Sequence, residues 1–208
     1  MQRSELKEKD YHKLLEKILP IILEKGLKGT TMDIVASRLC ISKRTLYEVF
    51  DSKTTMIKEV LHLLGDKSQK FVNDSFAKAD NVMEAFVEIF KYNRDLVKRV
   101  NVEFYRDMDN LYKDRREDYE KTRESRHEMM LKMYNLGVEQ GMFRQDVDYN
   151  VQSRMVGLQM EALKRMEELF PPGITLQRVF DSIIVGYLRS IASPGGMKIL
   201  DNLTRDIK

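Results

Sequence analysis

The chain has 208 residues, of which 33% are charged and 42% hydrophobic, and its formal net charge is +3. This length allows one large or two small domains with a buried core. A single cysteine, Cys40, excludes an intramolecular disulfide, and three histidines far apart in the sequence offer no recognisable metal-ligand spacing, so we predict no structural metal and no cofactor.

The hydrophobic runs and the first residues argue against a membrane protein. No apolar run approaches the roughly 20 residues of a membrane-spanning helix, and the opening MQRSELKEKDYHK is charged and lacks an apolar core. We therefore expect neither a signal peptide nor a transmembrane span, and we expect a cytoplasmic protein with no membrane partner.

Helical periodicity recurs along almost the whole sequence, whereas β-branched runs bounded by turn residues are few. The sequence therefore predicts an all-α fold of about nine helices. The first helix is expected in residues 5–25, where leucine and isoleucine form one stripe, and Gly26 and Gly29 end it. Pro20 inside this stripe removes a backbone donor, so we expect a kink there.

The stretch TTMDIVASRLCISKRTLYEVFDSK, residues 30–53, has the pattern of two short helices joined by a tight turn. Thr30 can cap the first helix, with Asp33 completing a capping box. Cys40 lies in the turn, and Ser42 can cap a second helix whose apolar residues recur at i, i+3 and i+4. This is the pattern of a helix-turn-helix, which places its second helix in the major groove of DNA.

The outward face of the second helix is basic, hydroxylated and aromatic, which suits contacts with phosphates and base edges. Lys53 follows at the start of the next helix, where backbone N–H groups favour a phosphate. The predicted DNA-contacting residues are Thr30, Thr31, Ser42, Lys43, Arg44, Thr45, Tyr47 and Lys53. An ordinary helical hairpin with a solvated basic face is the alternative. The positive excess lies in this part of the chain, because residues 1–60 hold 12 Lys or Arg against 9 Asp or Glu, and the remainder holds 24 against 24.

The same stretch resembles the N-terminal domain of TetR-type transcriptional repressors, over roughly residues 10–64. The residues that carry the resemblance are Thr30-Thr31, Val35-Ala36, Ile41-Ser42-Lys43-Arg44-Thr45-Leu46-Tyr47, Phe50 and Ser52-Lys53. The resemblance implies a three-helix DNA-binding domain in residues 1–52, joined through a long fourth helix to a helical effector-binding and dimerisation domain in residues 53–208. Cys40 stands where the family usually has glycine, and Pro20 stands where the family usually has a plain helix former.

The second domain is predicted to be a series of helices that begin at polar caps and end at glycine or proline. Asp51 or Ser52 can cap a long helix from Lys53 to about Phe76. Further helices are expected in residues 82–100 and 102–111, in the charge-dense run that ends at Gly137, and in residues 147–170 and 174–192. Ser193-Pro194-Gly195-Gly196 is expected to end the last of these, leaving a short and mostly polar tail. The loop NLGVEQGMFRQDVD resembles the G-x-x-x-G-x-x-R-x-D loop common in TetR-type ligand domains.

The helices expected in residues 151–170 and 176–192 carry an apolar stripe and two small residues, Gly157 and Gly186, that permit close approach. We predict a two-fold four-helix interface in a homodimer. The residues predicted for it are Met155, Leu158, Ala162, Met166, Val179, Ile183, Tyr187 and Ile191. The alternative is that they pack only within their own domain.

Aromatic residues and methionines are frequent between residues 82 and 134, together with tyrosine hydroxyls and one asparagine that could orient a ligand. The pocket predicted for an unknown small-molecule effector, apolar or amphipathic, comprises Phe86, Phe90, Asn93, Phe104, Tyr105, Met108, Tyr112, Met129 and Met133. Such residues also form plain hydrophobic core.

Three classes of function remain to be weighed. The favoured one is a ligand-responsive transcriptional regulator, most simply a repressor that binds a palindromic operator as a homodimer and is released by its effector. An architectural DNA-binding protein without an effector is the first alternative. An enzyme with an accessory helix-turn-helix is the second, and it is disfavoured because no serine nucleophile elbow, HExxH, Walker loop or GxGxxG is present.

Overall fold

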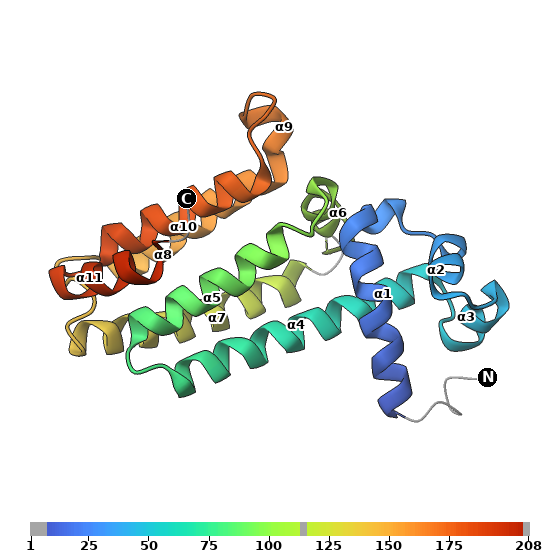
Figure 1. The fold of residues 1–208 in the computed structure, drawn as a ribbon, viewed down its shortest axis with the longest axis horizontal. Coiled ribbons are helices and arrows are strands. Elements are labelled where there is room, and N and C mark those ends of the chain that lie inside the picture. The colour runs from blue at the N-terminus through green and yellow to red at the C-terminus, as the bar shows by residue number, and fades with distance from the viewer. Residues whose placement is uncertain (1–7, 113–115, 206–208) are drawn as a thin grey trace. The chain divides into compact units, whose positions relative to one another are not determined.

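The computed structural model describes residues 8–112 and 116–205, and in these ranges the fold is all-α, as predicted (Figure 1). One isolated bridge pairs Phe143 with Ala192. The helices are α1 (Glu8–Gly29), α2 (Met32–Leu39), α3 (Lys43–Val49), α4 (Lys53–Lys78), α5 (Val82–Val97), α6 (Val102–Tyr112), α7 (Arg116–Glu139), α8 (Tyr149–Glu161), the 3-10 helix η3 (Ala162–Arg165), α9 (Met166–Leu169), α10 (Leu176–Ile191) and α11 (Pro194–Leu203).

The chain divides into two compact units that are each discontinuous in sequence. The first contains residues up to 70 together with 99–108, and the second contains 71–98 together with 109–208. The boundary predicted at residue 52 falls within the first unit, which also includes most of α4 and the first part of α6. Both α4 and α6 begin in the first unit and end in the second.

The first unit has a core made of the apolar stripes that the sequence pattern placed inward on α1 to α4. The fully buried side chains of this core include Ile18, Ile22, Val35, Leu46, Met56 and Val60. Ser52 caps α4, because its hydroxyl accepts the Thr55 N–H at 3.1 Å. Lys67 of α4 also donates to Glu16 of α1 at 2.6 Å.

The backbone of α1 leaves helical angles at Gly26. Gly26 has φ 71° and ψ 171°, and it is the residue of α1 with non-helical backbone angles. Pro20 keeps helical angles. Glycine interrupts the regular helix at this point because it reaches positive φ without a β-carbon clash.

The second unit has one aromatic-rich core to which α5, α7, α10 and α11 contribute. Its buried members are Val82, Met83, Val87, Tyr134, Phe143, Tyr149, Tyr187, Leu188, Ile191, Ala192 and Leu200. Tyr134 stacks on Tyr149 with ring centroids 4.9 Å apart, and Phe86 lies 5.8 Å from Tyr134 and 5.5 Å from Phe143. These rings form a continuous apolar layer inside the unit.

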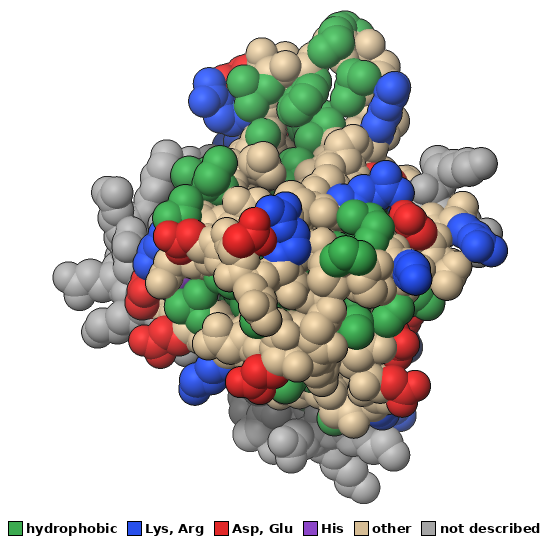
Figure 2. Space-filling model, turned by 90° about the vertical axis from the view of Figure 1, so that its left-hand side faces the viewer, with side chains coloured by type: hydrophobic (Ala, Val, Ile, Leu, Met, Phe, Trp, Pro, Cys, Tyr) green, Lys and Arg blue, Asp and Glu red, His purple; other side chains and the backbone are tan. Residues whose placement is uncertain are grey.

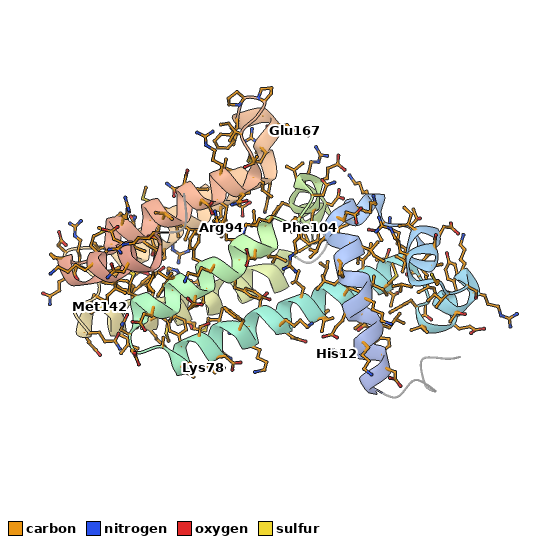
Figure 3. All side chains as sticks on the ribbon, viewed as in Figure 1. His12, Lys78, Arg94, Phe104, Met142 and Glu167 are labelled. Carbon is orange, nitrogen blue, oxygen red and sulfur yellow. The ribbon has the colours of Figure 1, made fainter. Side chains whose placement is uncertain are left out.

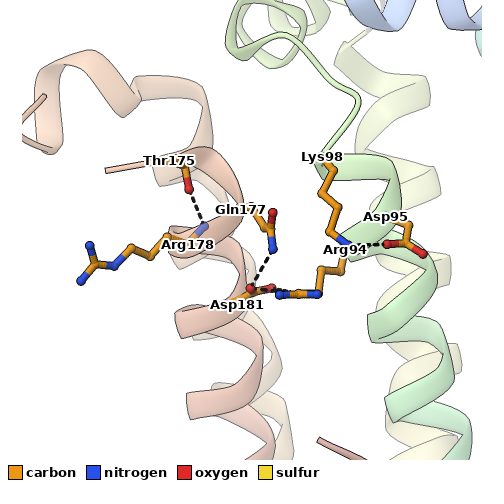
Figure 4. A network of polar contacts seen from close by, with 7 residues as sticks. All are labelled: Arg94, Asp95, Lys98, Thr175, Gln177, Arg178 and Asp181. Carbon is orange, nitrogen blue, oxygen red and sulfur yellow. Dashed lines mark hydrogen bonds and ion pairs between the residues drawn. The ribbon is translucent and has the colours of Figure 1, made fainter. Parts of the chain in front are cut away.

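A part-buried ion pair joins α5 to α10 in this unit (Figure 4). Arg94 Nε donates to both carboxylate oxygens of Asp181 at 2.9 Å, and Gln177 reaches the same carboxylate at 3.4 Å. In Figure 4 the Arg178 side chain points away from this network. The pair adds a directional contact between α5 and α10 to their apolar packing.

The loop that follows α7 explains why glycines recur at residues 137 and 141. A β-carbon at Gly137 would lie 2.2 Å from the Phe143 ring, and Gly141 has φ 69°. Arg144 then pairs with Asp146 at 2.6 Å and donates to the Ser190 carbonyl at 3.3 Å. The G-x-x-x-G-x-x-R-x-D spacing thus holds this loop against the end of α10.

Residues 194–203 form the helix α11, so the polar tail expected after the Ser-Pro-Gly-Gly run was wrong. Ser193 accepts the Gly196 N–H at 3.0 Å as an N-cap, and Pro194 occupies the first turn, where a missing N–H costs nothing. Leu200 is fully buried in the aromatic-rich core. Met142, labelled in Figure 3, lies beside this helix and accepts the Ser193 N–H at 3.0 Å. The run is therefore a helix start.

The single helix expected in residues 147–170 is instead α8, the 3-10 helix η3 and α9 in succession. Three residues per turn place Leu163 and Met166 on one side, and both are buried. Pro171 and Pro172 follow, as expected of a stop. Figure 2 shows hydrophobic side chains gathered at the top of the view, over α9 and the segment after it, where Leu169 is exposed.

Candidate nucleic-acid interface

The α2–turn–α3 segment is held by caps that differ from the prediction at one residue. Thr31, not Thr30, caps α2, and its hydroxyl accepts the Ile34 N–H at 3.2 Å. Ser42 caps α3 as predicted and accepts the Thr45 N–H at 3.0 Å. Both caps satisfy an N–H group that a helix end leaves unpaired.

Cys40 lies in the left-handed region at φ 53° and ψ 41°, and among the described residues it is the non-glycine with positive φ. Its N–H bonds back to the carbonyls of Ala36 and Ser37. The turn therefore has the conformation that glycine favours, at a cost of about 1–2 kcal/mol for a residue with a β-carbon.

The outward face of α3 presents a cation and an aromatic ring to solvent. The Arg44 side chain is 89% exposed and pairs with Glu48 at 3.1 Å, and Tyr47 is 49% exposed. Exposed pairs of this kind contribute little stability, so the guanidinium can exchange its partner for an anion at small cost. The face can therefore offer one forked cation and one phenol hydroxyl.

Lys43 and Lys53 lie at the two ends of this surface and both are held by local contacts. Lys43 pairs with Asp33 of α2 at 2.9 Å, and this hydrogen bond raises the pKa of the Lys43 ammonium. Lys53 opens α4 and donates to the Lys28 carbonyl at 2.9 Å. Ser42 and Thr45 face each other, with their hydroxyl oxygens 2.8 Å apart.

Thr30 was wrongly included among the DNA-contacting residues. Its side chain is fully buried, and its hydroxyl donates to the Gly26 carbonyl at 2.7 Å. This hydroxyl stabilises the end of α1 and has no surface to offer a phosphate. Thr31, its exposed neighbour, is the residue of the pair that can reach a ligand.

The residues predicted for the effector pocket fall into both compact units. Phe104, Tyr105 and Met108 belong to the first unit, where the rings of Phe104 and Tyr105 are 5.8 Å apart and burial raises the pKa of Tyr105 to about 12. Figure 3 places Phe104 on α6. Tyr112 has a side chain outside the described residues. The remaining predicted residues, Phe86, Phe90, Asn93, Met129 and Met133, lie in the second unit.

Part of the predicted pocket is ordinary core. Phe90 is buried and its ring stacks on Phe180 at 5.8 Å. Asn93 donates to the Ile89 carbonyl of its own helix at 2.8 Å, so its amide is already engaged. Phe86, Met129 and Met133 are only partly buried. These three leave some surface for a ligand, whereas Phe90 fits the alternative of plain hydrophobic core.

A groove of about 580 Å³ lies between α8 and α10, which sequence reasoning treated only as an interface. Met155, Ala162, Val179, Ile183 and Tyr187 from the predicted interface line it. Sequence pattern alone could not locate a concavity, since it identifies the apolar faces but not the space between them.

The predicted interface residues divide by exposure. Leu158 is 66% exposed and Met155 49% exposed, and Val151 is exposed on the same helix. Four others, Met166, Val179, Tyr187 and Ile191, are buried within the chain itself, so the prediction overstated what they offer to a partner. Their apolar positions are explained by the second unit's own core.

Tyr187 connects the floor of this groove to the aromatic-rich core. Its hydroxyl donates to the Tyr134 hydroxyl at 2.5 Å, and burial raises the pKa of Tyr134 to about 12. Burial also raises the pKa of Tyr187, with the nearby Tyr134 adding to the shift. In this hydrogen bond Tyr187 is the donor and Tyr134 the acceptor.

Within the part of the chain that the structure describes, no group of His, Cys, Asp and Glu could hold a metal ion. In the same residues no helix is both long enough and apolar enough to cross a bilayer.

A family model described as bacterial regulatory proteins, tetR family, matches residues 5–60, which include the whole α2–turn–α3 segment. Residues 5–60 therefore form a DNA-binding domain of the tetR family. With this domain, the chain is a transcriptional regulator with a helix-turn-helix, and not an enzyme. This outcome confirms the resemblance seen in the sequence and removes the enzyme alternative.

Similar proteins extend the match beyond the helix-turn-helix. The HTH-type transcriptional repressor KstR2 of Mycobacterium tuberculosis is 27% identical over 147 residues, which is 69% of this chain and 74% of KstR2. The solved structure of KstR2, described as a ketosteroid transcriptional regulator, has a TM-score of 0.59 at 24% identity, with 90% of this chain and 97% of that chain covered.

A second solved structure has a higher fold similarity and a lower identity. A transcriptional regulator from Saccharomonospora viridis in complex with choline has a TM-score of 0.68 at 16% identity, covering 90% of this chain and all of that chain. A TetR-family regulator from Marinobacter aquaeolei VT8 has a TM-score of 0.67 at 17% identity, with 97% and 98% covered. At these identities the likeness shows the fold alone.

Proposed function

We propose that this TetR-family regulator is a repressor that binds an operator of two half-sites as a homodimer and leaves it when a small molecule binds the second unit. The observation that carries the proposal is the outward face of α3, where Arg44 and Tyr47 are exposed and only weakly engaged. A major-groove helix needs side chains that can exchange a local partner for a base edge or phosphate at little cost.

Substitutions on α3 test the DNA surface. Arg44→Ala and Tyr47→Ala should each weaken binding to a selected operator by about 1–3 kcal/mol, because a base-edge contact is lost. Lys198→Ala is the matched control, since Lys198 is exposed on α11 of the second unit. Operator affinity unchanged in the Arg44→Ala, Tyr47→Ala double variant would refute this assignment of the DNA surface.

The homodimer is supported by apolar side chains that the single chain leaves uncovered. Val151, Met155 and Leu158 lie on one face of α8, spaced by four and three residues, and all three are exposed. Gly157 and Gly186 have open space around their α-carbons, which permits a close helix approach. A second copy covering this face would remove the apolar surface from water.

Sedimentation tests the dimer directly. Leu158→Glu should convert a dimer into a monomer at micromolar concentration, because it places a charge in an apolar interface while keeping a good helix former. Lys132→Glu, on the exposed surface of α7, is the control for the added charge. A wild-type protein that sediments as a monomer would end the dimer proposal.

The effector is proposed to be apolar or amphipathic and to bind beside Phe86, Met129 and Met133. This proposal rests on their partial burial in the aromatic-rich second unit. The relatives suggest the first probes, since KstR2 is described as a ketosteroid regulator and the Saccharomonospora viridis protein is in complex with choline. Steroid-like compounds and quaternary ammonium compounds should therefore open a thermal-shift screen.

Operator titration with any bound compound separates a repressor from an architectural protein. A true effector should lower operator affinity about 5–150-fold, which corresponds to a coupling of about 1–3 kcal/mol, and the operator must weaken effector binding by the same factor. Binding at a few selected operator sequences also distinguishes a regulator from an architectural protein, which covers DNA broadly. A compound that binds without changing operator affinity would not be an effector.

A further inference from the structure

Lys28, near the end of α1, is hydrogen-bonded to both of the helices that continue from the first unit into the second. Its main-chain N–H donates to the Asp107 carboxylate of α6 at 2.9 Å. Its carbonyl accepts from the Lys53 ammonium at the start of α4, also at 2.9 Å. One peptide segment therefore joins a buried acid to a lysine of the DNA surface, and all three residues lie in the first unit.

Asp107 is a buried carboxylate, with 4% of the residue exposed. Burying such a group is costly unless hydrogen bonds replace its water, and here the replacements are the Lys28 N–H and the Lys28 ammonium, which lies 3.5 Å from the second oxygen. A β-carbon at Gly26 would lie 3.5 Å from Asp107 Oδ2 and 3.7 Å from Glu103 Cβ. The end of α1 thus lies directly against α6, and Asp107 fixes the position of the Lys28 peptide.

Other hydrogen bonds also hold the end of α1 in place. Asn101, just before α6, donates its N–H to the Leu23 carbonyl at 2.8 Å, and Thr30 donates its N–H and its hydroxyl to the Gly26 carbonyl. A lysine ammonium has three N–H donors. The Lys28 carbonyl takes one of those of Lys53, and two remain for a phosphate.

We propose that Asp107 is a positioning residue for DNA binding: through the Lys28 peptide it holds the Lys53 ammonium where that ammonium meets a backbone phosphate. The inference rests on the proposed function, and it adds to it a residue of α6, which the sequence did not associate with DNA. Asp107 lies on α6, which begins in the first unit and ends in the second.

The salt dependence of operator binding tests this role, because a phosphate contact releases counterions. The logarithm of the operator-binding constant falls linearly with the logarithm of the salt concentration. Losing the Lys53–phosphate contact should make that slope less steep by about 0.9. The full-length variants Lys53→Ala and Asp107→Ala should show the same lowered slope, and the double variant should show no further loss. Asp107→Asn should keep the wild-type slope, since its amide oxygen still accepts the Lys28 N–H.

Glu103→Ala is the matched control, because Glu103 is an exposed acid of the same helix that pairs with Arg106 at 3.0 Å. It should leave the slope unchanged. If Asp107→Ala fails to fold by circular dichroism, Asp107→Ser gives the same measurement, since its hydroxyl is too short to replace the carboxylate.

The possible outcomes separate this proposal from the proposed function. A wild-type chain that selects no DNA refutes the proposed function itself. Wild-type binding with a Lys53→Ala slope like that of the wild type overturns the positioning role alone. A purely structural role for Asp107 would lower the melting temperature and the affinity with an unchanged slope, and its effect on affinity would add to that of Lys53→Ala, which also overturns the proposal.

Discussion

Gly137 of α7 lies against a ring that has no room to move, so Gly137→Ala should destabilise the second unit. A β-carbon there would lie 2.2 Å from Phe143 Cδ2 and 2.5 Å from Cε2. The Phe143 ring is 2% exposed and is enclosed by Phe86, Tyr134 and Tyr149, with centroids 5.5–6.4 Å away. Overpacking costs about 1–3 kcal/mol, and the rigid surroundings place this case at the upper end.

The helix propensity of alanine offsets part of that cost. Replacing glycine in a helix interior gains about 1 kcal/mol, so the net loss should be about 2 kcal/mol. Near the midpoint, about 1 kcal/mol shifts the melting temperature of a chain of this size by about 2–4 °C. Gly137→Ala should therefore melt about 4–8 °C below the wild type in far-UV circular dichroism.

Gly65 of α4 is the matched control, because no atom lies within 4 Å of a β-carbon built there. Gly65→Ala should gain the helix propensity alone and melt about 2–4 °C higher. Both substitutions replace glycine by alanine in a helix, yet they should change the melting temperature in opposite directions. A Gly137→Ala variant as stable as the wild type, with Gly65→Ala behaving as expected, would refute the reasoning about Phe143.

Three further predictions concern the turn, the buried phenols and the α5–α10 ion pair. Cys40→Gly should stabilise the chain by about 0.5–1 kcal/mol in urea unfolding. It removes about 1–2 kcal/mol of strain from the left-handed backbone, which exceeds the cost of the greater conformational entropy that glycine loses on folding. Cys40→Ala keeps a β-carbon and should show no such gain. Burial raises the pKa of Tyr134 from 10.0 to about 12, so the folded state holds this proton more tightly than the unfolded state. The resulting contribution to the free energy of unfolding is complete below pH 10.0 and is lost as the pH rises towards 12. In a Tyr134→Phe variant the melting temperature should therefore fall less steeply between pH 10 and 12. Asp181→Ala leaves the part-buried Arg94 without its partner and should cost about 1–3 kcal/mol in urea unfolding, whereas adding Arg94→Ala should cost little more.

The sequence by itself was sufficient for the local features of this protein. Ser42 as a helix cap and the inward stripe of α3 follow from residue chemistry within a few positions, and the tetR-family match agrees with them. The long α4 beginning at Lys53 likewise follows from the two candidate caps before it, Asp51 and Ser52, of which Ser52 is the cap. Such features need only neighbours along the chain, so a sequence pattern can determine them.

Tertiary packing decided the features that depend on residues far apart in the chain. Thr30 and Thr31 are adjacent hydroxyls, yet only the arrangement of α1 buries the first and leaves the second to cap α2. The Ser-Pro-Gly-Gly run follows the end of α10, as predicted, but it also starts α11, whose Leu200 is buried in the second unit's core. The role of Asp107 also depends on tertiary packing, because its partner Lys28 is 79 residues away in the sequence. Contacts at such separations leave no local signal, since the free energy of burial depends on what the folded chain brings together.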